Sequence, residues 1–368
     1  MNKTGFGFLR LPRLNPDDEK SVDIQALCFL VDRFLEKGGS YFDTAYTYLG
    51  GASEEALKKA LVERYPRERF RIADKLPGYA ARSKEDNHHF FEESLKRCGV
   101  DYFDVYLLHG INAENYETAQ QLDQFAFLQH LKETGKVKKT GFSYHDTAEL
   151  LDQILTEHPE IEYVQLQINY LDWDSQSVQS RKCYEAAVRH HKAVLVMEPV
   201  KGGSLANLPS EAEQLLKQTH CDDSPARWAI RFASDLEAVE VVLSGMNAMH
   251  QIEDNMASFH SLNGEEIAAL QQAARIIRDN TAIGCTGCGY CTDGCPVGMP
   301  IPQYFSLYNE YKRHPAELWK TQTIYTSVSN AKVPASACIR CGQCESRCPQ
   351  KISVINWLHE VDSVLQEK

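Results

Sequence analysis

The sequence has no long hydrophobic run and no excess of basic residues. Its longest strongly apolar segment, residues 193–197, has the length of a strand, whereas a membrane-spanning helix needs about 20 apolar residues. The 368 residues include 51 acidic and 39 basic side chains, for a net charge of −12, which excludes a dedicated nucleic-acid binder because such proteins carry a basic excess. The first residues also lack the apolar core of a signal peptide. We therefore expect a cytoplasmic protein with neither a membrane nor a nucleic-acid partner, in which thiols stay reduced.

Short β-rich runs alternate with helical patterns over the first 275 residues. The runs lie at 5–9, 41–44, 71–74, 104–109, 138–143, 163–167, 193–198 and 239–244. Each precedes a segment of helical periodicity, and one such segment is expected to form a single helix across Leu122, Phe125, Leu128 and Leu131. No G-x-G-x-x-G turn follows the first run, which disfavours a doubly wound sheet. The pattern predicts an α/β fold, a (β/α)8 TIM barrel, with its functional groups at the C-terminal ends of the strands.

Ionisable side chains follow three successive predicted strands. They are Asp43, Tyr48, Lys75 and His109. Taken singly, such residues are common as helix caps, packing groups or surface charges. Taken together they indicate a proton-transfer unit, because a lysine cation lowers the pKa of a nearby phenol and a histidine can hydrogen-bond a carbonyl or relay a proton.

The stretches FDTAYTY (42–48), ADK (73–75) and LLH (107–109) resemble the Asp–Tyr–Lys–His tetrad of the aldo-keto reductases. The resemblance covers roughly residues 4–275. It implies that Tyr48 is the general acid or base, with Lys75 and Asp43 tuning it. It also implies that His109 orients a small-molecule carbonyl or alcohol substrate while hydride passes to or from a nicotinamide.

The same resemblance implies a set of cofactor contacts. GFS (141–143) is similar to the family's strand-end GVS, which places Ser143 at the nicotinamide carboxamide, and Gln165 takes the second carboxamide position. Met197 stands where the family usually stacks an aromatic ring. A methionine still packs on a ring but stacks less specifically.

The segment after the eighth predicted strand departs from the family. Ser244, Gly245, Gln251 and Asn255 take cofactor-binding positions there, and Met246 lies among them. NADPH-dependent members place Lys or Arg in this segment to bind the 2′-phosphate, and none is present between Leu243 and Asn255. Because a phosphate favours cationic partners, the choice between NADH and NADPH stays open.

Cysteine is concentrated near the C-terminus, where eight of the twelve lie. Two runs have the spacing C-x2-C-x2-C-x3-C followed by proline: Cys285, Cys288, Cys291 and Cys295, then Cys338, Cys341, Cys344 and Cys348. This is the bacterial ferredoxin spacing for [4Fe–4S] clusters, in which the fourth cysteine of a run binds the other cluster. A pair of zinc sites also uses C-x2-C pairs, but zinc does not explain a fourfold run before proline that is repeated.

The crossed spacing predicts two cluster-binding sets. The first set is Cys285, Cys288, Cys291 and Cys348, and the second set is Cys338, Cys341, Cys344 and Cys295. Helices are expected at 264–279, at 301–313 and after the last cysteine, so residues 281–368 resemble a mainly helical ferredoxin-like domain behind a barrel of residues 1–280. The pairs His220–Cys221, His88–His89 and His190–His191 are weak metal signals, and the remaining cysteines read as buried apolar groups.

The two predicted halves differ in the electrons they handle. A nicotinamide transfers two electrons as hydride, whereas a [4Fe–4S] cluster takes one, and no motif for a bridging flavin is present. Three hypotheses follow. The protein is an NAD(P)-linked carbonyl reductase or alcohol dehydrogenase whose clusters are structural or regulatory. Alternatively, it couples a barrel-bound substrate through the clusters to an external carrier of the ferredoxin or flavodoxin type, or it is an electron-transfer module with a silent barrel.

Overall fold

The computed structural model describes residues 3–16, 18–257, 260–313 and 315–366. Contacts divide the chain into two compact units. The barrel unit comprises residues 1–174, 179–199 and 226–262, and the second unit comprises residues 175–178, 200–225 and 263–368. The single boundary at residue 280 stays a prediction.

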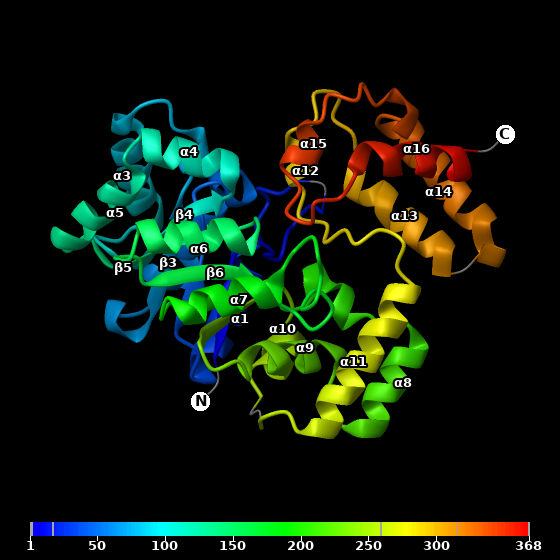
Figure 1. Cartoon of the computed structure of the whole chain (residues 1–368), viewed down its shortest axis with the longest axis horizontal. Coiled ribbons are helices and arrows are strands. Elements are labelled where there is room, and N and C mark those ends of the chain that lie inside the picture. Colours follow the sequence, from blue (N-terminus) through cyan, green and yellow to red (C-terminus); the bar gives the residue numbers. More distant parts are fainter. Residues whose placement is uncertain (1–2, 17, 258–259, 314, 367–368) are drawn as a thin grey trace. The chain divides into compact units, whose positions relative to one another are not determined.

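Eight parallel strands close the barrel in sequence order (Figure 1). They are β1 (Thr4–Gly7), β2 (Tyr41–Asp43), β3 (Arg71–Leu76), β4 (Phe103–Ile111), β5 (Val137–Tyr144), β6 (Tyr163–Gln167), β7 (Ala193–Met197) and β8 (Val239–Gly245). The closing pair aligns Gly7 of β1 with Gly245 of β8. The predicted (β/α)8 barrel is therefore confirmed, with all eight strands within a few residues of their expected positions.

Helices follow the strands around the barrel unit. They are α1 (Ile24–Glu36), α2 (Ala52–Leu57), α3 (Lys84–Cys98), α4 (Ala113–Gln121), α5 (Gln124–Glu133), α6 (Ala148–Glu157), α7 (Ser180–Arg189), α9 (Pro225–Ser234) and α10 (Met249–Asn255). The helix expected across Leu122, Phe125, Leu128 and Leu131 is confirmed from Gln124 onward as α5, but Leu122 lies outside it. Leu122 ends α4 and Asp123 takes a left-handed backbone conformation, φ 50°, which a continuous right-handed helix cannot contain. None of the helices among the described residues is long and apolar enough to cross a membrane.

Among its described residues the second unit contains helices joined by loops, and no strand. Its helices are α8 (Ser210–Thr219), α11 (Gly264–Asp279), α12 (Tyr290–Asp293), α13 (Ile301–Arg313), α14 (Leu318–Ala331), α15 (Gln343–Ser346) and α16 (Val354–Leu365). Figure 1 shows α8 beside α11 and α12 beside α15, and these pairs are in contact. An aromatic and aliphatic core joins α13, α14 and α16 through Tyr304, Tyr308, Tyr325 and Leu358.

Candidate functional site

Three of the four ionisable residues lie in one layer of the barrel interior. The apolar layer beneath them includes Tyr41, Ala73 and Leu107. Because successive side chains on a strand point to opposite faces, the residue two positions later returns to the interior, one layer nearer the C-terminal end. Those positions are held by Asp43, Lys75 and His109. Strand alternation alone therefore brings them to one rim, with Tyr48 in the turn that follows β2.

The lysine of this set is enclosed by the other groups. Nζ of Lys75 lies 2.6 Å from Oδ1 of Asp43 and also donates to the backbone oxygen of Thr44 at 2.8 Å. The same ammonium lies 4.7 Å from the ring centroid of Tyr48, within the range of a cation–π contact. Both partners of the ion pair are buried, with 0% and 4% of their side chains exposed. The geometry fixes one charged group directly against the phenol.

The phenol of Tyr48 is held in its protonated form. Burial raises the pKa of Tyr48 well above its usual value, and the Asp43 carboxylate, Tyr79 and Glu198 add to that shift. The prediction of a lowered pKa is therefore wrong, because burial and the acidic neighbours outweigh the lysine cation. A protonated phenol is a proton donor at neutral pH.

His109 is held as a neutral imidazole at the same rim. Burial lowers its pKa well below the usual value, and the charge of Lys75 adds to the effect. Its ring meets that of Tyr48 edge-on, with centroids 5.6 Å apart. Nδ1 of His109 is buried and has no hydrogen-bond partner among the described residues. A neutral imidazole with spare hydrogen-bonding capacity suits the orientation of a neutral carbonyl group.

The two carboxamide-binding candidates occupy neighbouring strands. Ser143 of β5 and Gln165 of β6 are aligned in register and are 1% and 2% exposed. Oγ of Ser143 accepts the backbone N–H of Gly110 at 2.8 Å, and Nε2 of Gln165 donates to Oδ2 of Asp43 at 3.3 Å. These bonds fix both side chains at the rim, so the residues present fit a nicotinamide carboxamide.

Met197 is half-buried at the end of β7. Glu198, the residue after it, was not predicted from the sequence as part of the site. Glu198 has a left-handed backbone, φ 55°, which non-glycine residues rarely adopt. Nδ2 of Asn169 donates to its carbonyl oxygen at 3.1 Å. Its carboxylate is among the groups that raise the pKa of Tyr48, so it lies near this phenol. The left-handed conformation is not readable from a glutamate in the sequence.

The candidates after β8 differ in their surroundings. Nδ2 of Asn255 donates to Oγ of Ser244 at 3.0 Å, and both are buried. Oε1 of Gln251 accepts the backbone N–H groups of Asn247 and Ala248, so it caps the first turn of α10. Met246 is fully buried. These side chains serve local structure and offer no positive charge.

A cation nevertheless lies beside this strand end. Arg10 belongs to the loop after β1, and its Cβ would be 3.1 Å from a Cβ built on Gly245. The barrel closes by pairing β1 with β8, which brings this loop against the end of the last strand. This cation comes from 235 positions earlier in the chain, so the sequence of the segment after β8 gives no sign of it.

The first cysteine set is brought together within the second unit. Burial raises the pKa of the Cys291 thiol to about 12, and its thiol neighbours add to that shift. Those neighbours are Cys288, Cys285 and Cys348. Cys348 comes from the second run, so the crossed grouping matches the proximity of the side chains. Thiols that oppose one another's ionisation become favourable ligands once a cation compensates their charge.

The second set lines a mainly apolar hollow. Four of its lining residues are the cysteines Cys295, Cys338, Cys341 and Cys344. The others include Val297, Met299, Ile301, Ile355 and Leu358. A shell of this kind excludes water from a metal centre and tunes its potential, so these residues fit a [4Fe–4S] cluster.

The two motifs repeat their backbone conformation. Gly287 and Arg340, at the third position of each run, have φ 67° and 56°, and Gly289 and Gly342, at the fifth, have φ 89° and 79°. A four-residue helix follows in each case, α12 and α15. In the first run the backbone N–H of Gly287 donates to Sγ of Cys285 at 3.4 Å. Such turns direct amides at cysteine sulfur, a contact that tunes cluster potentials.

Comparison with known proteins assigns a family to two successive parts of the chain. Residues 4–275 match the Aldo/keto reductase family, and residues 284–352 match the 4Fe-4S dicluster domain. The chain belongs to the aldo/keto reductase family. It is an oxidoreductase with an added iron–sulfur domain.

Individual aldo-keto reductases are similar to the barrel part of the chain. An aldo-keto reductase of Mycobacterium avium is 24% identical over 250 residues, covering 67% of this chain and 81% of its own. Aldo-keto reductase AKR11C1 from Bacillus halodurans aligns with a TM-score of 0.58 at 23% identity, over 74% of this chain and 91% of its own. An aldo-keto reductase from Klebsiella pneumoniae in complex with NADPH aligns with a TM-score of 0.57 at 20% identity, over 73% and 90%. These structural likenesses show the shared fold.

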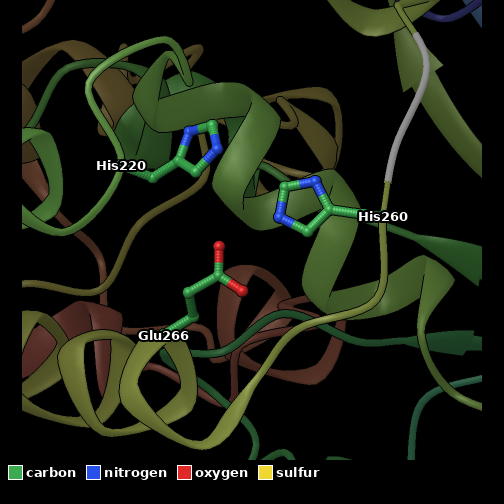
Figure 2. A group of neighbouring side chains, drawn as sticks. All are labelled: His220, His260 and Glu266. Carbon is green, nitrogen blue, oxygen red and sulfur yellow. The ribbon is translucent and has the colours of Figure 1, made fainter.

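One histidine signal from the sequence lies outside both sites of this aldo/keto reductase. In Figure 2 the carboxylate of Glu266, on α11, is directed toward His220, which ends α8. A ring nitrogen and a carboxylate oxygen of this pair lie within 4.8 Å of each other. His260, also drawn there, belongs to the barrel unit, where its Nε2 lies 2.8 Å from Nη2 of Arg231. An arginine cation at the ring disfavours a metal at that histidine.

Proposed function

We propose that the protein reduces a small-molecule carbonyl compound by nicotinamide-linked hydride transfer, with Tyr48 as the general acid. The observation that carries the proposal is the buried contact of Lys75 with Asp43 and with the face of the Tyr48 ring. The bound nicotinamide supplies the hydride. Tyr48 donates its proton to the carbonyl oxygen, and the adjacent ammonium stabilises the phenolate that remains.

The other rim residues position the reactants. Neutral His109 hydrogen-bonds the carbonyl oxygen and directs it toward the phenol. Ser143 and Gln165 would hold the nicotinamide carboxamide and so orient the bound cofactor. Glu198 places a negative charge near the phenol and so disfavours anionic substrates. The proposal therefore includes a neutral aldehyde or ketone as the substrate class.

The two cysteine sets are proposed to bind two [4Fe–4S] clusters. Cysteine grouping and the apolar hollow support this assignment. One observation favours a second candidate function, electron exchange with an external one-electron carrier: Cys341 is exposed and its neighbour Ile339 is 61% exposed. A cluster ligand at the surface is accessible to a ferredoxin or flavodoxin.

The test uses the full-length protein purified without oxygen. NADH and NADPH are titrated against a panel of neutral aldehydes and ketones while nicotinamide and cluster absorbance are followed. Tyr48→Phe should lower kcat by about 100-fold or more, the usual contribution of a general acid. Tyr46→Phe is the matched control, since its hydroxyl donates to Glu93 away from the set. Equal turnover of Tyr48→Phe and the control overturns the assignment. Cluster bleaching by pyridine nucleotide supports the second candidate, and its absence excludes coupling.

A further inference from the structure

The loop that follows β7 in the chain lies against a segment of the first cysteine set. Its residues Lys201, Gly202 and Gly203 have φ 47°, 65° and 99°, three successive left-handed conformations that turn the backbone sharply. A Cβ built on Gly202 would lie 2.0 Å from the carbonyl oxygen of Thr286. Thr286 stands between two ligands of the first set, Cys285 and Cys288. Only a glycine permits this approach.

The same loop reaches the other segment of the first set through Lys201. Nζ of Lys201 donates to Oε1 of Gln350 at 2.9 Å. Gln350 follows Cys348 by two positions, and the two side chains are almost fully buried, with 5% of Lys201 and 8% of Gln350 exposed. The loop thus contacts both stretches of chain that supply ligands to the first set, and it places an ammonium group beside one of them.

A buried cation at this position changes the energetics of a bound cluster. Reduction adds one negative charge, so a nearby positive charge stabilises the reduced form over the oxidised form. Screening by salt and water is weak for buried groups. Net charge, hydrogen bonds and solvent exposure are the features that set cluster potentials. Lys201 changes the net charge around the cluster.

We infer that Lys201 raises the reduction potential of the cluster bound by Cys285, Cys288, Cys291 and Cys348, and that Gly202 lets the loop close over that cluster. Lys201 is a positioning and tuning residue, because it acts through charge and through Gln350. The inference rests on the proposed binding of two clusters.

The first experiment is a redox titration followed by electron paramagnetic resonance in the intact protein. Lys201→Met should make the one-electron equilibrium of one cluster at least tenfold less favourable to reduction, which is about 59 mV, and leave the other unchanged. Lys201→Arg keeps the charge and should restore the native value. The matched control is Lys351→Met, which removes an exposed lysine three positions after Cys348. Unchanged potentials, or an equal shift in the control, overturn the inference.

The second experiment tests the close approach of the loop. Gly202→Ala introduces the 2.0 Å clash, whereas Gly203→Ala meets nothing within 4 Å, although both positions have positive φ. We expect Gly202→Ala to lose about half of the bound iron and Gly203→Ala to retain it. Equal iron content in the two variants overturns the role of the loop. If the native protein holds no iron–sulfur cluster under anaerobic purification, the proposed binding of two clusters itself fails, an outcome distinct from clusters that are present but insensitive to the loop.

Discussion

Nζ of Lys75 lies 2.6 Å from Oδ1 of Asp43, and both side chains are buried at the barrel rim. The pair is aligned by neighbouring strands, β2 and β3, so its geometry is set by the barrel and not by a flexible loop. Burial raises the pKa of Asp43 although Lys75 opposes that shift. The ion pair therefore depends on both partners, since either charge alone would be desolvated without compensation.

Lys75→Met should impair both stability and catalysis. Removing one partner of a buried ion pair costs about 3–5 kcal/mol, and kcat for carbonyl reduction should fall at least about 100-fold because Tyr48 loses the adjacent cation. The double variant Lys75→Met with Asp43→Asn should regain stability but not activity. Urea unfolding and steady-state kinetics measure the two effects. Activity restored in the double variant would contradict a role for the ammonium in catalysis.

A buried carboxyl pair on the outer side of β3 should make stability depend on pH. Burial, followed by the carboxyl of Glu54, raises the pKa of Asp74 well above its usual value. Because the unfolded chain releases this proton at lower pH than the folded chain does, stability falls as pH rises from about 4, the ordinary carboxyl pKa, up to the folded value. Asp74→Asn should therefore raise the free energy of unfolding at pH 7 and flatten its decline above pH 4.

Asp104→Asn provides the contrast for that measurement. Burial opposes the ionisation of Asp104, but the hydrogen bonds from Arg67 and the backbone of Ile72 outweigh it and lower the pKa. Its stabilising effect is present above the unfolded pKa and is lost as pH falls through the folded one. Asp104→Asn should therefore lower the free energy of unfolding at pH 7. Urea unfolding measured from pH 4 to 8 distinguishes the two variants. If the free energy of unfolding falls with pH as steeply in Asp74→Asn as in the native chain, the prediction for Asp74 is contradicted.

The sequence was sufficient for features that depend on local pattern. The alternation of strand and helix patterns predicted the barrel and placed Asp43, Lys75 and His109 at one rim, and the cysteine spacing predicted the crossed sets. Features that depend on closure or on backbone conformation were missed. Arg10 reaches Gly245 only because β1 pairs with β8. Helix α14 was also not predicted. Its helical signal is weak because its sequence is rich in threonine and serine and includes an isoleucine and a valine.

Arg10 should contribute to the choice of nicotinamide. The cation lies beside Gly245, at the strand end where the segment after β8 offers no Lys or Arg of its own. If it contacts the 2′-phosphate, Arg10→Gln should raise KM for NADPH about tenfold while KM for NADH changes little, since phosphate favours arginine partners. Arg13→Gln, from the same loop and exposed, serves as the control. A similar change in both KM values would assign Arg10 to general cofactor positioning.

The crossed cysteine sets can be tested in a background that retains one cluster. Serine in place of Cys285, Cys288 and Cys291 should abolish the first cluster and leave the second, whose ligands then include Cys295 from the same disabled run. In that background Cys295→Ser should remove the remaining cluster or alter its spectrum, because one of four thiolate ligands is lost. Cys348→Ser should have no further effect, since its thiol neighbours Cys291. Iron content and electron paramagnetic resonance report the outcome. The opposite pattern, with Cys348→Ser removing the cluster and Cys295→Ser neutral, would show that each run binds its own cluster.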